Sequence, residues 1–251
     1  MSLFTRNALG EIYIPGSSIK GAIRNCIIAV KILENKDDFE EIKEKFLEYL
    51  KNKKKGISNI AKEVEKKVFS TPENLNPHIG IAVTDTYIEK NRPTGIYADI
   101  DYKAKKGSFK QIPKQREYLL KGAKLKCALK IDKRTAERLE INSAQQVQEM
   151  IEKANKYLFE KSIPFSEMIK ESKNTQNTKL LPNGYEKCLV LGSNTGFYQK
   201  TILSYLIGDD YGVLRDAVAG KTLRLPGGLS LIEADGKKVL CGFVRMQFRE
   251  I

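Results

Sequence analysis

Hydrophobic residues near the start of the chain recur at the spacing of a helix. After a Pro-Gly turn, apolar side chains occupy positions 19, 22, 23, 26, 27, 30 and 33. Steps of three and four residues place them all on one helical face. We therefore predict an amphipathic helix in which Ser17 or Ser18 caps the first turn. Lys20 and Arg24 lie on its polar side.

Further helices are predicted in four later parts of the chain. Residues 37–50 and 57–69 have the pattern of surface helices. A long helix is predicted to open at Ser143, where Gln146 stands three residues on, in the position of a capping box. A shorter helix is expected near residues 200–207.

From residue 79 the hydrophobic spacing changes to two, which is typical of strands with one face in water. The alternation is present in four segments: 79–83, 96–103, 122–132 and 239–248. It is clearest in the third, where every second residue is apolar and Lys124, Lys126 and Lys130 share the opposite face. That face is predicted to be exposed.

Helices and strands do not alternate as regular βα units, so the pattern predicts an α+β fold with antiparallel sheets and packed helices. A chain of 251 residues is long enough for one large domain or two small ones. Residues 171–185 are polar and poor in hydrophobic side chains, as in a loop or a join. We expect an N-terminal region over 1–170, with a helical insertion, and a C-terminal region over 171–251.

The charge of the chain indicates a polyanionic partner. Lys and Arg number 44 against 31 Asp and Glu, a net charge of +13. Residues 84–134 hold 14 of the basic side chains and 6 of the acidic ones, and so carry +8 of that total. Most basic residues are lysines, which suit contact with phosphates better than bidentate reading of bases. A merely soluble surface is the alternative.

The basic track expected on this segment is interleaved with aromatic residues that can stack on unpaired bases. Its cations include Lys105, Lys106, Lys110, Lys114 and Arg116, ahead of the three strand lysines. Its aromatic members are Tyr102, Phe109 and Tyr118. Some of these rings must instead fill the core.

Several classes of site are excluded by composition. The four cysteines include no C-x-x-C pair, so neither a zinc ribbon nor a thioredoxin-type redox pair is expected. The single histidine, His78, rules out a site with two imidazoles in one subunit. The longest apolar run, near 26–30, is far short of the ~20 residues of a membrane span. We expect no cofactor, no metal, no membrane contact and a cytoplasmic location.

Two weaker catalytic candidates remain. Asp99 and Asp101 fall two apart on a predicted strand, where they could hold a divalent ion or act on a ribose hydroxyl. The favoured interpretation is two solvated residues that offset nearby lysines. His78 could act as a general base, but a loop histidine with no identified partner is usually surface structure.

A glycine-rich loop over residues 192–201 invites comparison with a nucleotide P-loop. A Walker loop needs lysine directly after its second glycine, whereas three residues separate Gly196 from Lys200 here. We prefer a loop that lets an RNA backbone approach at Gly192 and Gly196, assisted by Lys200. A purely structural turn is the alternative.

The longest motif is IPGSSIKGAIR over residues 14–24. Free helix amides, serine hydroxyls and Lys20 would form an anion site, and an ordinary capped helix is the equal alternative. The string resembles the P-G-S-S-[IL]-K-G-x-[IL]-R signature of the RAMP superfamily of CRISPR RNA-binding proteins. Further segments resemble the fifth Csm subunit of type III-A CRISPR complexes: VTDT at 83–86, REY at 116–118, LGSNTGF at 191–197 and the glycine pairs of 225–244.

This resemblance implies ferredoxin-like (RRM-like) RNA-recognition modules. It implies a noncatalytic subunit at the end of the complex where the 3′ part of the CRISPR RNA lies, next to other Csm subunits, assisting guide maturation and assembly in antiviral defence. Family members carry a strand and a loop ahead of the P-G-S-S motif, where this chain has residues 1–13. The first module is therefore expected to be incomplete at its start. Asp85, within VTDT, is expected to serve a turn or a cap.

Single-stranded CRISPR RNA is thus the expected ligand, gripped through phosphates and shape. The expected contact residues are Ser17, Ser18, Lys20, Arg24, Lys105, Lys106, Arg116, Lys124, Lys126, Lys130, Gly192, Gly196 and Lys200. Two rival classes stay open. One is an endoribonuclease that uses His78, a tyrosine or the Asp99/Asp101 pair, and the other is a protein-interaction scaffold.

Overall fold

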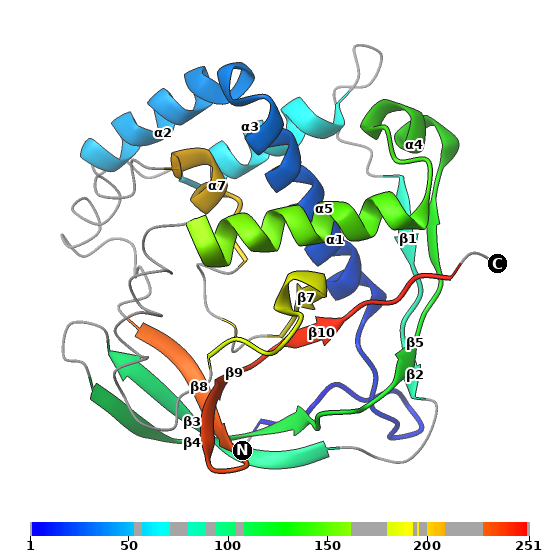
Figure 1. Ribbon diagram of the computed structural model, residues 1–251, viewed down its shortest axis with the longest axis vertical. Coiled ribbons are helices and arrows are strands. Elements are labelled where there is room, and N and C mark those ends of the chain that lie inside the picture. Colours follow the sequence, from blue (N-terminus) through cyan, green and yellow to red (C-terminus); the bar gives the residue numbers. More distant parts are fainter. Residues whose placement is uncertain are drawn as a thin grey trace.

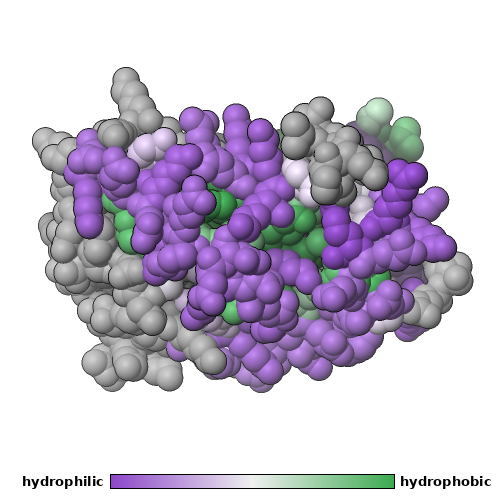
Figure 2. Space-filling model, turned by 90° about the horizontal axis from the view of Figure 1, so that it is seen from above, coloured by the Kyte–Doolittle hydropathy of each residue, from purple (hydrophilic) through white to green (hydrophobic). Residues whose placement is uncertain are grey.

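The computed structural model describes residues 2–52, 57–70, 80–88, 94–103, 108–161, 180–192, 195, 200–208 and 228–249. Figure 1 shows most helices gathered on one side, a four-stranded sheet at the opposite end and a narrow β-ribbon along one flank. Figure 2, seen from the helical side, shows a surface covered mainly by hydrophilic residues, with hydrophobic ones visible chiefly in its hollows. No helix in the described part of the chain has the length and apolar character to cross a bilayer.

The first predicted helix is confirmed as α1 (Gly16–Glu34). Its apolar stripe is buried and packs against α5 (Ala144–Lys156). The predicted capping box of α5 is also present, with the Ser143 hydroxyl accepting from the Gln146 amide. These two helices form the centre of the molecule because each presents one continuous hydrophobic face.

The surface helices are α2 (Glu40–Lys51), which follows the 3-10 turn η1 (Lys36–Phe39), and α3 (Ile57–Phe69). They pack on each other through buried Phe46, Ile60 and Val64. Two shorter helices in the described part of the chain are α4 (Lys133–Leu139) and α7 (Leu203–Ile207).

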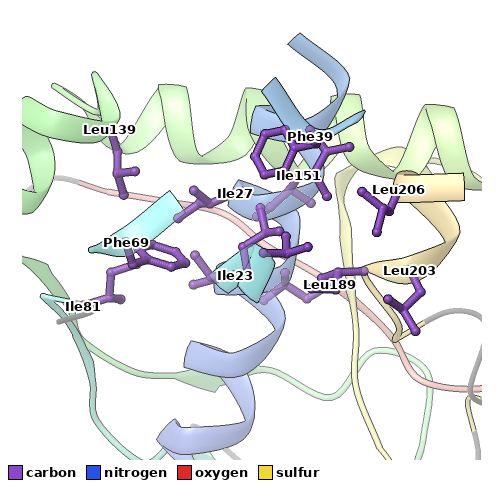
Figure 3. Close-up of a cluster of buried hydrophobic side chains, with 14 of the residues drawn as sticks. Ile23, Ile27, Phe39, Phe69, Ile81, Leu139, Ile151, Leu189, Leu203 and Leu206 are labelled. Atoms are coloured by element: carbon purple, nitrogen blue, oxygen red, sulfur yellow. The ribbon is translucent and has the colours of Figure 1, made fainter. Parts of the chain in front are cut away.

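One hydrophobic core joins elements from both ends of the chain (Figure 3). It gathers Ile23 and Ile27 of α1, Phe69 of α3, Ile151 of α5 and Leu203 of α7. A smaller cluster lies under the four-stranded sheet, with Ile100, Leu158, Phe159, Leu180, Leu231 and Leu240. The C-terminal third of the chain therefore contributes to the main core.

The large sheet is antiparallel, as predicted, with strand order β4-β3-β8-β9. Its strands are β3 (Thr94–Lys103), β4 (Ser108–Leu119), β8 (Gly228–Ala234) and β9 (Lys237–Leu240). The pairing of β3 with β8 joins the region 1–170 to the region 171–251 in one sheet. A β-bulge interrupts the β3–β4 register between Ala98 and Ile100.

The β-ribbon on the flank consists of two short antiparallel pairs in line. It contains β1 (Ile81–Val83) paired with β6 (Leu129–Ile131) and β2 (Tyr87–Ile88) paired with β5 (Leu125–Lys126). The strand predicted over 122–132 is thus two strands. A third pair joins β7 (Cys188–Val190) to β10 (Phe243–Arg245), so the strand predicted over 239–248 is also divided. The α+β antiparallel class is confirmed.

Candidate functional site

A cavity of about 660 Å³ lies between the start of α1, the end of β4 and the loop after β7. Its walls include Ser18, Asn25, Arg116, Tyr118, Gly192 and Lys200. All of them except Asn25 belong to the three segments PGSS, REY and the glycine-rich loop. Motifs far apart in the sequence therefore meet at one cavity, which we call the motif cavity.

The start of α1 touches the β-ribbon directly at Gly16. A Cβ atom at this position would lie 2.2 Å from the Val83 carbonyl oxygen and 2.7 Å from that of Thr84. Real Cβ atoms do not approach this closely, so only glycine lets the two backbones meet here. The glycine of the PGSS motif is thus required by packing.

The helix cap differs from the one predicted. Because α1 already begins at Gly16, Ser17 and Ser18 lie inside the helix, where their exposed hydroxyls do not cap it. The acceptor is Asp85, whose Oδ1 receives the Gly16 amide at 2.7 Å. A carboxylate at a helix N-terminus also interacts favourably with the helix dipole. The cap of α1 therefore comes from Asp85 and not from a serine hydroxyl.

Each polar residue of the VTDT segment has a structural partner. The Ile14 amide donates to Thr86 Oγ1 at 2.7 Å, and the Thr86 amide donates back to the Ile14 carbonyl at 3.1 Å. The Thr84 hydroxyl accepts from the Ala128 amide at 2.9 Å. Together with Asp85, these contacts fasten the approach to α1 onto the β-ribbon, and the expected capping role of Asp85 is confirmed.

The REY segment is organised around a buried carboxylate. Asp99 is 2% exposed; it accepts hydrogen bonds from Arg116 Nε and from the Tyr118 hydroxyl, each at 2.7 Å. The prediction of a solvated Asp99 is therefore wrong. Fixing Arg116 through Nε sets the plane of a guanidinium that lines the motif cavity.

This error coincides with the irregular pairing of β3 with β4. Three residues of β4, 112–114, lie between the partners of Ala98 and Ile100, opposite the single residue Asp99, so the register shifts at this point. Asp99 and Ile100 are both buried, which breaks the alternation of faces that the prediction assumed, and Ile96, predicted on the same face as Ile100, is 55% exposed. The side chain of Asp101 lies outside the described residues, so the proposed Asp99/Asp101 pair is not seen as a pair.

Glu117, the middle residue of REY, holds the N-terminal segment against β4. Its carboxylate accepts from the Phe4 amide at 2.9 Å and from Arg6 Nη2 at 2.6 Å. Desolvation acts to raise the pKa of Glu117, but the hydrogen bonds from Phe4 and Arg6 outweigh it and lower the pKa below its ordinary value. Phe4 and Glu117 both line the motif cavity.

The glycine-rich loop closes the cavity from the other side. Gly192 is exposed and has φ +100°, a conformation that other residues rarely adopt. No atom lies within 4 Å of the position that a Cβ atom would take there. Its carbonyl accepts from the Thr195 hydroxyl at 2.9 Å and from Lys200 Nζ. Asn25 Nδ2 of α1 donates to the Lys200 carbonyl at 2.9 Å. Desolvation lowers the pKa of Lys200.

The other predicted contacts that the structure describes do not line the motif cavity. Ser17 is exposed in the first turn of α1, and Lys20 is half-buried. Arg24 pairs with Glu65 of α3 at 3.0 Å. The strand lysines Lys124, Lys126 and Lys130 are exposed on the β-ribbon, as predicted. Outside the described residues lie Lys105, Lys106, Gly196 and His78.

The sequence analysis did not identify Asn155, a buried member of the cavity wall. Its Nδ2 donates to the carbonyls of Glu186 at 2.9 Å and Cys188 at 2.6 Å. Asn25 was equally missed, although it lies seven residues after Ser18 and so on the same face of α1. That spacing is the signal by which it could have been found.

Reactive groups are few in the described part of the chain. Burial raises the pKa of Cys26 and of Cys241 to about 12 and that of Cys188 to about 11, so these thiols stay protonated. Among the described residues, no group of three or more His, Cys, Asp and Glu could hold a metal ion.

Comparison with known proteins identifies the family. A family profile described as the RAMP superfamily matches residues 1–196. A chain in the cryo-EM structure of a Csm-crRNA-target RNA ternary complex of a type III-A CRISPR-Cas system has a similar fold, with TM-score 0.62, 18% identity, and coverage of 97% of this chain and 75% of that one. The crystal structure of T. onnurineus Csm5 gives TM-score 0.58 and 18% identity, over 97% and 73% of the two chains. No curated protein matches in sequence.

Proposed function

Because the chain belongs to the RAMP superfamily, we propose that it is a noncatalytic RNA-binding subunit of a type III-A CRISPR (Csm) ribonucleoprotein. It holds the 3′ part of the single-stranded CRISPR RNA, contacts neighbouring Csm subunits and assists guide maturation and assembly. The similarity in fold to a chain of a Csm-crRNA-target RNA complex supports this assignment.

The observation that carries the proposal is the meeting of three sequence motifs at the motif cavity. The cavity combines the cations Arg116 and Lys200 with the exposed backbone of Gly192 and the hydroxyl of Ser18. These are groups that bind a phosphate and its ribose without reading a base. The volume of about 660 Å³ is in the range of small-molecule and cofactor sites, so it suits a nucleotide unit.

Electrostatics supports the same partner. The net charge of +13 attracts a polyanion from a distance, and its backbone can then bind in the motif cavity. The ion pair between Asp99 and Arg116 reduces the local positive charge, so Lys200 is the cation on which phosphate attraction in the cavity depends most.

The test is binding of the full chain to labelled single-stranded CRISPR RNA over a salt series. We expect affinity to fall steeply with salt. Lys200→Ala should weaken binding and reduce the slope of log affinity against log salt by about 0.7, the value for one lost phosphate contact on a single strand. Lys62→Ala, which removes an exposed charge from α3, is the matched control and should change neither.

The same samples, with and without magnesium, distinguish the proposal from the endoribonuclease alternative. RNA that stays intact while bound supports the noncatalytic role. Discrete cleavage products that disappear in His78→Ala or Asp99→Asn would instead establish an enzyme. Binding that is indifferent to salt and to Lys200→Ala would contradict an RNA contact at the motif cavity.

A further inference from the structure

The outer face of the β-ribbon carries a row of exposed side chains. Lys124, Lys126 and Lys130 alternate with residues packed on the main core, so their side chains stand on the solvent face. Neighbouring positions on one face of a strand are about 7 Å apart. The residue directly opposite Lys130 on the paired strand is Ala82, which has a small side chain. The Lys130 side chain therefore has no large cross-strand neighbour at that position.

One large aromatic residue lies on the same face as the lysines. Tyr87 is 60% exposed and lies directly opposite Lys126 in the antiparallel register, so both side chains project from the same face. The three aromatic residues expected from the sequence to stack on bases did not include it. Of those three, the structure shows only the side chain of Tyr118, and that one is bound to Asp99.

One hydrogen bond ties the segment before Tyr87 to the wall of the motif cavity. Ile14 and Pro15 line the cavity, and the Thr86 amide donates to the Ile14 carbonyl at 3.1 Å. Tyr87 is the next residue along the chain. The exposed ring is therefore one residue away from a backbone contact with the cavity wall.

We infer that the outer face of the β-ribbon is a second contact for single-stranded RNA, in which Tyr87 stacks on an unpaired base and Lys124, Lys126 and Lys130 neutralise the flanking phosphates. The inference rests on the proposed function and extends it from the cavity to a path along the ribbon. An exposed ring among cations on one face is the combination found on single-strand binding surfaces. Stacking requires a base that is free of a duplex, so the contact selects single strands.

The lysines and the ring are tested separately. The probe is a fluorescein-labelled single-stranded oligouridylate, bound to the full chain over a series of potassium chloride concentrations and followed by anisotropy. Tyr87→Ala should weaken binding about tenfold, whereas Tyr87→Phe, which keeps the ring, should stay within about twofold of the wild type. Lys124→Ala with Lys130→Ala should lower the salt slope by about 0.7 for each lysine.

Two controls exclude general effects. Lys62→Ala with Lys66→Ala removes two exposed charges from α3 and should leave the slope unchanged. Binding of a duplex RNA of equal length should be insensitive to Tyr87→Ala, because paired bases cannot stack on the ring. Unchanged thermal unfolding of each variant shows that the fold is intact.

The outcomes separate this inference from the proposed function. If wild-type protein binds the oligouridylate and both ribbon variants bind it equally well, the ribbon contact is wrong and the cavity remains. If the ribbon variants lose assembly with other Csm subunits but keep RNA affinity, the face is a protein contact and the inference is wrong. If the wild-type chain binds no RNA, alone or with its Csm partners, both fail.

Discussion

The two regions that were expected to contact RNA differ in how their residues take part in the fold. At the start of α1, Gly16 is required by its closeness to Val83 and Thr84, and its amide is bound by Asp85. On the outer face of the β-ribbon, Lys124 and Lys130 contribute nothing to the core. The first region is specified by packing and the second by solvent exposure.

The sequence features of the two regions therefore need different interpretations. In the long motif PGSSIKG, packing explains the glycine, and the bond to the glycine amide explains its distant partner Asp85. Three exposed lysines on one face of a ribbon are compatible with many folds and add little stability, so we look for their explanation in a partner. Substitutions should therefore affect stability in the first region and binding in the second.

The largest effect is expected from Gly16→Ala. The new methyl group would overlap the Val83 and Thr84 carbonyls, and overpacking against backbone should lower the free energy of unfolding by about 3 kcal/mol. Gly21→Ala is the matched control in the same helix, because no atom lies within 4 Å of its Cβ position. It should raise stability by about 0.5–1 kcal/mol. Urea denaturation measures both, and equal effects would contradict the packing role of Gly16.

A smaller loss is expected from Asp85→Ala. Removal of the acceptor leaves the Gly16 amide without its cap, which should cost about 1 kcal/mol. Asp85→Asn keeps an acceptor oxygen and should recover part of that loss. Thermal and urea unfolding of the two variants give the comparison. Equal stability of Asp85→Ala and wild type would show that water satisfies the helix start equally well.

The pH dependence of stability tests the other motif at the cavity. The pKa of Glu117 is lowered in the folded state from 4.5, so its contribution is present above pH 4.5 and is lost as the pH falls toward the folded value. The difference in unfolding free energy between wild type and Glu117→Gln should therefore narrow as the solution is acidified. If this difference in unfolding free energy did not change with pH, the ionised Glu117 carboxylate would not be the group that holds Phe4 and Arg6.

The smallest effect on stability is expected from the ribbon. Lys124→Ala with Lys130→Ala should leave the free energy of unfolding within about 0.5 kcal/mol of wild type, because exposed lysines pack on nothing. RNA affinity measured on the same preparations should fall. A large loss of stability instead would mean that the ribbon lysines, like Gly16, belong to the fold.

Much of the fold could be predicted from periodicity. The stripe of α1, the capping box of Ser143 and Gln146 and the exposed face of Lys124 to Lys130 are all local, and all are present. The face of β3 could not be predicted, because a bulge between Ala98 and Ile100 leaves no mark in the alternation of side chains. The buried Asp99 lies at that shift in register, so the alternation of side chains predicted the wrong face for it.

The site was predicted in its parts and not in its arrangement. Each motif was visible, but the approach of Arg116 to the loop at Gly192 and to Ser18 is set by the fold. Arg24 shows the reverse case. It lies in the motif helix, yet the helical turn carries it to Glu65 of α3 and away from the motif cavity.

RNA contact at the motif cavity and on the β-ribbon is tested most directly by ultraviolet crosslinking of bound CRISPR RNA to the full chain, with the linked peptides identified by mass spectrometry. We expect crosslinks in the start of α1, in residues 116–118, in the loop after β7 and at Tyr87. Crosslinks confined to α2 and α3, or their absence from every one of the predicted segments, would contradict it.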